Sequence, residues 1–123
     1  MTAMGDSGWD LTGAARDAIA FRDARDWAQF HRPKNLAAGL AIEAGELQEL
    51  FLWEEPKSAE EIRSDRARVT RIAEEMADVA VYLLTLASDL GVNLAEAVND
   101  KLKDNAKRYP VDQYRGSAEK APH

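Results

Sequence analysis

The 123-residue sequence contains no cysteine, which excludes a disulfide framework and any metal site built on thiolates. It also lacks any apolar run that approaches the 18 residues of a membrane span. The N-terminus does not show the charged-then-apolar pattern of a signal peptide. These absences predict a soluble, cytoplasmic protein that has no membrane partner.

The sequence has no excess of positive charge and contains few β-branched residues. Its net charge is −6, so a nucleic-acid polymer is not expected as a partner. Alanine, glutamate, leucine, lysine and arginine dominate the composition, which favours an all-α fold. The length is sufficient for one domain. We expect a flexible N-terminus over residues 1–10, a helical domain over 11–109 and an irregular tail over 110–123.

Turn and capping signals divide the helical domain into four predicted helices. The first is expected over residues 11–30 and ends before Pro33, because the residue before a proline avoids helical angles. Asn35 is the expected N-cap of the second helix, which runs to about residue 53. Short connections predict an antiparallel four-helix bundle. Tryptophans near the helix ends favour burial between subunits, so an oligomer is expected.

The third and fourth helices begin at stronger signals. Ser58 and Glu61 have the spacing of a capping box, and the helix that they start continues to residue 90 or kinks near residues 64–65. Gly91 is a natural terminator for that helix. Asn93, with Glu96 at the box position, is the expected N-cap of a fourth helix that ends near residue 108.

Two acidic pairs are the most informative feature of the sequence. Glu43 and Glu46 lie three residues apart in the second predicted helix, and Glu75 and Asp78 repeat this spacing in the third. At about 100° per residue, Glu43 and Glu75 fall in the middle of the apolar stripes of their helices. Asp78 and Glu46 fall at the stripe edges. Each helix therefore carries two carboxylates on the face that should be buried.

Buried carboxylates are costly unless they are paired or bind a metal ion. Four converging carboxylates would also repel one another and raise their pKa values. Divalent cations remove both problems, and an all-oxygen set without cysteine or histidine favours Mg²⁺. The alternative is that the acids are solvated or paired with arginine and lysine.

Together with these acids, several further stretches resemble one enzyme family. They are Phe-His-Arg-Pro-Lys-Asn-Leu at 30–36, Glu-Leu-Gln-Glu-Leu-Phe-Leu-Trp at 46–53, Lys-Leu-Lys-Asp-Asn-Ala-Lys-Arg-Tyr-Pro at 101–110 and Arg-Gly-Ser-Ala at 115–118. The pattern is similar to the MazG-like all-α nucleoside triphosphate pyrophosphohydrolases, in particular their dCTP pyrophosphatase branch. The resemblance covers about residues 16–118.

The resemblance implies a Mg²⁺-dependent hydrolase that cleaves dCTP, and 5-modified dCTP, to a monophosphate and pyrophosphate in nucleotide-pool sanitation. It implies dimers or tetramers. Glu43, Glu46, Glu75 and Asp78 are then the metal ligands and catalytic residues. The expected substrate-binding residues are Trp27, His31, Trp53, Lys101, Asn105, Arg108 and Tyr109.

Other interpretations of these residues remain open. The tryptophans are otherwise packing residues, and the basic residues at 101 and 108 otherwise complement the helix dipole. Lys34 and Leu52 depart from the usual residues of the branch near the base pocket, so they bear on the base preference and not on the chemistry. The alternatives are a broad-specificity housekeeping pyrophosphatase and a non-catalytic helical metal-binding or interaction protein. A di-iron bundle fits poorly because no Glu-x-x-His spacing is present.

Overall fold

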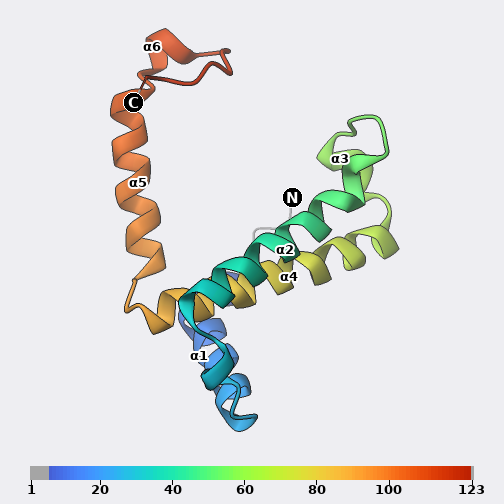
Figure 1. The fold of residues 1–123 in the computed structure, drawn as a ribbon. Helices are drawn as coiled ribbons and strands as arrows, with labels where there is room; N and C mark the ends of the chain where they lie inside the picture. Colours follow the sequence, from blue (N-terminus) through green and yellow to red (C-terminus); the bar gives the residue numbers. More distant parts are fainter. Residues whose placement is uncertain (1–5, 123) are drawn as a thin grey trace. The chain divides into compact units, whose positions relative to one another are not determined.

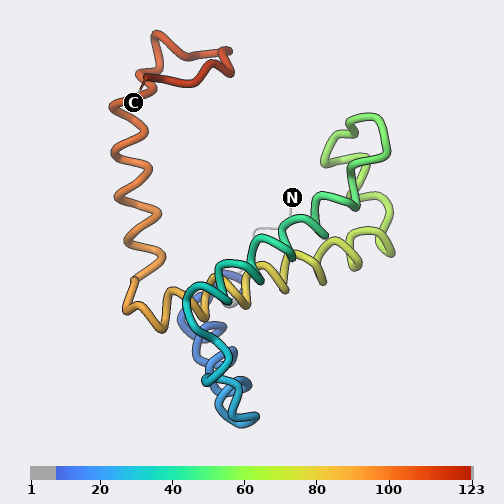
Figure 2. Tube along the Cα trace, in the orientation of Figure 1, coloured from blue at the N-terminus to red at the C-terminus, as the bar shows by residue number. Residues whose placement is uncertain are grey.

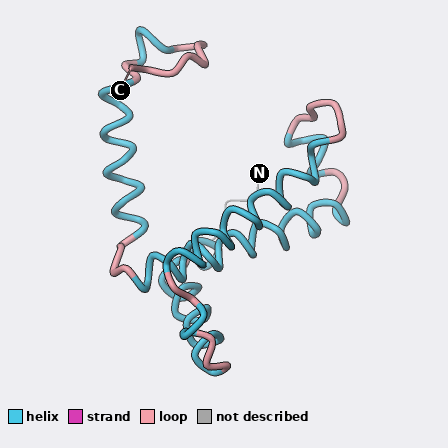
Figure 3. The backbone as a smooth tube through the Cα atoms, viewed as in Figure 1, coloured by secondary structure: helices cyan, strands magenta, loops and turns pink. Residues whose placement is uncertain are grey.

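The computed structural model describes residues 6–122, which form helices joined by loops (Figure 1). No strand occurs among these residues (Figure 3). The expected all-α class is therefore confirmed. The elements are 3-10 turns at Asp6–Trp9 and Ala28–Phe30 and the helices α1 Leu11–Ala24, α2 Pro33–Leu52, α3 Ala59–Arg63, α4 Arg66–Asp89, α5 Leu94–Arg108 and α6 Val111–Tyr114.

The chain divides into two compact units, the first ending at Gly91 and the second beginning at Val92. The expected flexible N-terminus falls partly on residues 1–5, which lie outside the described range. No single described helix is long and apolar enough to cross a membrane. Only as a bent pair do α4 and α5 meet the length and composition of a span.

The first unit is organised around α2 and α4, which run side by side along their length (Figure 2). Leu36 of α2 is 1% exposed, and Leu84 and Thr85 of α4 are buried as well. Helix α1 also packs against α4 in this unit. Here Arg22 is buried and its Nη1 donates to Asp89 Oδ2 over 2.7 Å. The core of this unit therefore lies near the C-terminal end of α4.

A glycine lets α2 and α4 approach closely. A Cβ added to Gly39 would lie 2.5 Å from Cε1 of Tyr82 on α4, which is far inside van der Waals contact. The aromatic ring therefore lies directly against the glycine backbone. No other residue fits this position of α2 without displacing the ring.

Two expected helix boundaries are wrong. The first helix ends at Ala24 rather than near residue 30, because Asp26 adopts a φ of 53° and breaks the helical path. Asn35 is not an N-cap, since α2 already begins at Pro33 and Arg32 is its extended N-cap residue. Proline is well suited to the first helical turn, where its missing N–H needs no partner. The Asn35 side chain instead donates to the Phe30 carbonyl over 3.1 Å.

The remaining capping signals are confirmed. Ser58 and Glu61 form a reciprocal capping box at the start of α3. The long third helix breaks at residues 64–65, where Asp65 accepts from the Arg68 amide and starts α4. Beyond α4, Gly91 has a φ of 66°. The Asn93 side chain accepts from the Glu96 amide at the start of α5.

In the second unit, the tail folds back on the end of α5. The Ala121 amide donates to the Tyr109 hydroxyl over 3.2 Å, and Ala121 is buried. The Tyr109 ring packs edge-on against Tyr114, with centroids 5.0 Å apart. Within the expected irregular tail, α6 covers Val111–Tyr114, and residues 117–122 have no regular secondary structure. The local sequence shows no helical period there, and the contacts of Ala121 and Tyr114 join the tail to the end of α5.

Alanine substitutions at two glycines of α2 test the close approach of α2 and α4. We expect Gly39→Ala to lower the free energy of unfolding by about 1–3 kcal/mol, because the new methyl group displaces the Tyr82 ring. Gly45→Ala is the matched control, since its Cβ would meet nothing within 4 Å, and it should stabilise the helix by about 0.5–1 kcal/mol. Urea denaturation of both variants measures the difference. Equal effects of the two substitutions would contradict the close contact.

Candidate functional site

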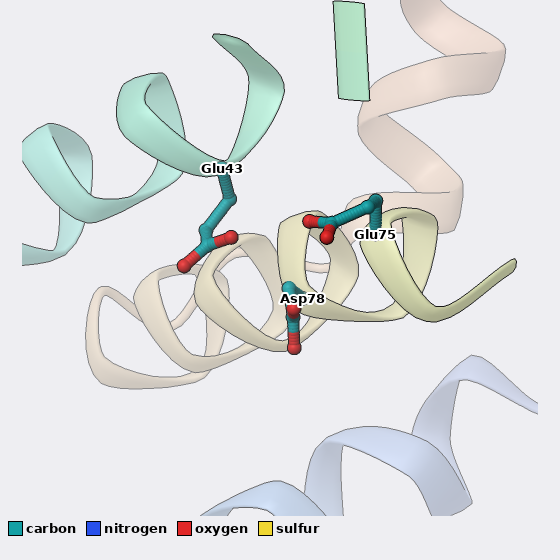
Figure 4. Close-up of side chains that lie close together, drawn as sticks. All are labelled: Glu43, Glu75 and Asp78. Atoms are coloured by element: carbon teal, nitrogen blue, oxygen red, sulfur yellow. The ribbon is translucent and has the colours of Figure 1, made fainter. Parts of the chain in front are cut away.

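Three of the four predicted acids converge between α2 and α4 in the first unit. One carboxylate oxygen each from Glu43, Glu75 and Asp78 can be chosen so that all three lie within 4.8 Å of one another. Glu43 projects from α2 towards α4, and the carboxylate of Glu75 points back towards it (Figure 4). The arrangement is a compact all-oxygen cluster contributed by two helices.

Helical periodicity explains why these acids meet. Around Glu43, the apolar residues of the same face of α2 are all buried or half-buried: Leu36, Leu40, Leu47 and Leu50. Glu75 is half-buried within the corresponding stripe of α4: Ile72, Val79, Tyr82 and Leu86. Asp78 and Glu46 are exposed at the stripe edges. Burying the apolar stripes against each other thus brings the central carboxylates together.

Glu46 lies beside this cluster rather than within it. The adjacent Glu46 carboxyl is the main cause of a raised pKa at Glu43, followed by burial and the surrounding negative charges. Burial, followed by the charges of Glu46 and Asp78, raises the pKa of Glu75. The surroundings of Glu43 and Glu75 therefore make ionisation of these two carboxyl groups unfavourable.

The cluster contains polar atoms that the protein leaves unsatisfied. Glu43 Oε2 and Glu75 Oε2 are buried and have no hydrogen-bond partner among residues 6–122. Within residues 6–122, the salt bridges involve other acids, Asp23, Asp89 and Glu54, and none reaches the cluster. The alternative in which these carboxylates are paired with arginine or lysine is therefore not supported. Buried, unpaired carboxylate oxygens fit a hard divalent cation.

The expected base-binding residues of this unit lie after α1 and at the end of α2. Trp27 is 42% exposed and packs edge-on against Phe21, with ring centroids 5.7 Å apart. His31 is half-buried, and its Nδ1 is buried with no hydrogen-bond partner in the described range of the chain. Trp53 is 89% exposed at the C-cap of α2. Trp53 therefore packs little against the described residues of its own chain.

The four expected phosphate- and sugar-binding residues belong to the second unit. Lys101 is exposed on α5, and Asn105 is half-buried one turn later. Arg108 Nη2 donates to the Ala121 carbonyl over 3.4 Å, while the Tyr109 hydroxyl accepts from the Ala121 amide. Arg108 and Tyr109 therefore also hold the tail, a role that the spacing of charges along the helix did not indicate.

Sequence reasoning missed a set of contacts at the far end of α2. Arg68 of α4 forms a salt bridge with Glu54, which directly follows Trp53, and donates to the Leu50 carbonyl. The only sequence signal is a pair of opposite charges on the two sides of a loop. Such pairs are common on protein surfaces, so the sequence alone does not single this one out.

Comparison with known proteins places this geometry in a family. The sequence profile of the MazG-like family matches residues 39–122, a range that includes the entire acidic cluster. The chain belongs to the MazG-like family. The motifs that suggested the family in the sequence are thus supported by a match over most of the chain.

The chain is also similar in sequence to curated proteins named dCTP pyrophosphatase 1. The chain is 46% identical over 101 residues to dCTP pyrophosphatase 1 of Bos taurus, a match that covers 80% of this chain and 58% of the relative. The corresponding human protein is 42% identical over 101 residues, covering 81% and 59%. The chain therefore spans less than two thirds of the length of these curated relatives.

A solved structure shares the fold. It is a pyrophosphatase from Archaeoglobus fulgidus DSM 4304, with a TM-score of 0.69 and 41% sequence identity. The similarity covers 77% of this chain and 87% of that one.

The raised pKa values predict how pH affects the metal-free protein. We expect the free energy of unfolding to fall as the pH rises from about 4.3 towards neutrality. Glu43 and Glu75 hold protons in the folded state at pH values where the unfolded chain has released them. Glu43→Gln removes one of the repelling groups, so it should weaken this pH dependence and raise the melting temperature at neutral pH.

Thermal unfolding in EDTA across this pH range measures both effects. Glu49→Gln is the control, because Glu49 is exposed on the same helix. If Glu49→Gln weakened the pH dependence as much as Glu43→Gln, general surface charge rather than the cluster would be responsible.

Proposed function

We propose that the protein is a Mg²⁺-dependent nucleoside triphosphate pyrophosphohydrolase that converts dCTP, and 5-modified dCTP, to the monophosphate and pyrophosphate. In this role it removes surplus or modified nucleotides from the nucleotide pool. The observation that carries the proposal is the convergence of Glu43, Glu75 and Asp78 between two helices, with two buried oxygens that no group in the described part of the chain satisfies. The dCTP pyrophosphatases among the relatives support the choice of substrate.

The proposed reaction is hydrolysis of the triphosphate at its α-phosphorus. Water attacks the α-phosphorus, the bond between the α-phosphorus and the bridging oxygen breaks, and pyrophosphate leaves. A bound Mg²⁺ would polarise the phosphate and lower the pKa of a water molecule. Glu43, Glu46, Glu75 and Asp78 would hold the ion, and their apolar neighbours limit the access of bulk water. Without a cation, these acids would repel a triphosphate, so the protein's own residues make catalysis depend on the metal.

The other expected substrate-binding residues would recognise the base, the sugar and the phosphates of the nucleotide. Trp53 and Trp27 offer aromatic faces on which a pyrimidine can stack, and His31 offers a buried ring nitrogen that needs a partner. On α5, Lys101 and Arg108 would hold the leaving pyrophosphate, and Asn105 a phosphate or the sugar. Tyr109 would then support this surface by fixing the tail, as its contact with Ala121 suggests.

We also propose that the chain assembles as a four-helix bundle in a homodimer or homotetramer. Large apolar side chains remain well exposed on several helices; among them are Ile42 at 63%, Met76 at 55% and Leu102 at 59%. Among the described residues of its own unit, α5 has no second long helix to cover its apolar side chains. Isolated helices of this length are only marginally stable in water, which favours burial in an assembly.

The proposed reaction can be tested by pyrophosphate release from a panel of ribo- and deoxynucleoside triphosphates. We expect release that requires Mg²⁺, stops in EDTA and is fastest with dCTP or 5-methyl-dCTP. Glu43→Gln and Asp78→Asn should abolish release while circular dichroism stays helical, because each loses one charged oxygen donor. Full activity of either variant would contradict the metal-site assignment, and equal release from every base would contradict the assigned base pocket.

The stacking role of Trp53 makes a separate prediction. Trp53→Ala should raise KM for dCTP by about tenfold or more, the order of the 1–3 kcal/mol that a stacked base contributes. kcat should change much less, because the ring does not touch the reacting phosphate. Trp9→Ala is the control, as Trp9 is also exposed but has no assigned role. A loss of thermal stability without any change in KM would show that Trp53 only packs.

A further inference from the structure

We propose that Arg68 is a positioning residue, which holds Trp53 at a set place relative to the acidic cluster by binding the Leu50 carbonyl before it and the Glu54 carboxylate after it. The inference deepens the proposed function and rests on it, because it assumes that Trp53 contacts the nucleotide. It assigns a role to an arginine of α4 that lies outside both acidic pairs.

The clamp consists of three interactions made by one guanidinium group. Arg68 Nη1 donates to Glu54 Oε2 over 2.8 Å, and Nη2 donates to Glu54 Oε1. Nη2 also donates to the carbonyl oxygen of Leu50 over 3.1 Å. Both side chains are largely shielded, with exposed fractions of 20% for Arg68 and 26% for Glu54. The guanidinium lies 5.5 Å from the ring centroid of Phe51, which adds a cation–π contact.

These partners lie on both sides of Trp53 in the sequence. Leu50 precedes it by three residues and belongs to the last turn of α2, where carbonyl groups have no helical partner. Glu54 follows it directly. Trp53 itself is the C-cap, and its side chain is 89% exposed, so contacts of the ring do little to hold it. The place of the ring is therefore set by the backbone, and Arg68 fixes the backbone.

The same arginine links this segment to the acidic cluster. Arg68 lies seven residues, or about two helical turns, before Glu75 on α4. Leu50 lies seven residues after Glu43 on α2. The clamp thus joins the two helices about 10 Å along each axis from the carboxylates. Because both helices are rigid over two turns, the clamp sets the separation of Trp53 from the acidic cluster.

Arginine is required for this geometry. Its planar group donates to both oxygens of a carboxylate and to a third acceptor at once, whereas a lysine ammonium acts as a point charge. Lys57 already lies 3.6 Å from Glu54 Oε2 and is more exposed, yet it cannot reproduce the planar contact. The paired contact also lowers the pKa of the Glu54 carboxyl, which keeps it charged at neutral pH.

The test compares Arg68→Gln and Arg68→Lys with Arg66→Gln, a control on an exposed arginine of the same helix. We expect Arg68→Gln to raise KM for dCTP by about tenfold and to change kcat by less than about threefold. Arg68→Lys should keep most of this KM increase, because it retains the charge but not the planar contact. Arg66→Gln should leave both parameters unchanged. The Mg²⁺ concentration that gives half-maximal activity should stay the same in all variants.

A double-mutant cycle separates positioning from general support of the fold. If Arg68 acts through Trp53, the double variant Trp53→Ala with Arg68→Gln should have the same KM as Trp53→Ala alone. Additive increases in KM would overturn the proposal. If Arg68→Gln fails to fold, Glu54→Ala removes the same contact from its other side and takes its place in the cycle.

A measurement without turnover keeps this inference distinct from the proposed function. The fluorescence contributed by Trp53 is obtained by comparison with Trp53→Ala, and its anisotropy should fall in Arg68→Gln as the segment becomes mobile. Unchanged anisotropy would overturn the clamp even if the enzyme is active. If the wild-type protein released no pyrophosphate, the proposed function would fail, and with it the role of Trp53 in binding. A fall in anisotropy would then support the local clamp alone.

Discussion

The main constraint on the first unit is that carboxylates are held close together between two packed helices. Glu43 and Glu75 occupy positions that periodicity would give to leucine or valine, and their surroundings make ionisation unfavourable. The fold must therefore supply the stability that this region lacks. It does so beyond the cluster, in the buried residues near the C-terminal end of α4 and in the ion pair of Arg22 with Asp89. The helix α4 thus has a stabilising half and a half that carries the site.

Much of this arrangement can be predicted from the sequence because it depends on local rules. Composition indicates an all-α chain, and side chains within three residues of a helix start identify the caps at Ser58 and Asn93. The 3.6-residue period alone places Glu43 and Glu75 on the buried faces of their helices. A repeated acidic spacing on two apolar stripes has few structural explanations, which is why it indicates the right family.

The features that escape prediction depend on contacts between distant residues or on unusual backbone angles. The residues around Ala24 do not indicate that Asp26 adopts a left-handed conformation, so the first helix is predicted to be longer than it is. The tail is ordered by Ala121 meeting Tyr109, twelve residues earlier in the chain. The contact of Gly39 with Tyr82 likewise requires knowledge of the helix register. Sequence patterns indicate which face is buried, but not which partner each residue meets there.

The left-handed conformation of Asp26 has a consequence for how relatives of this protein should be compared. Asparagine, aspartate and glycine tolerate such angles, whereas β-branched residues do not. The Gln29 amide also donates to the Asp26 carbonyl over 3.0 Å and to its side chain, which adds to the local constraint. A restricted choice of residues at this position would therefore reflect the path of the chain. An invariant aspartate in an alignment, so close to Trp27, would not by itself identify a residue that touches the nucleotide.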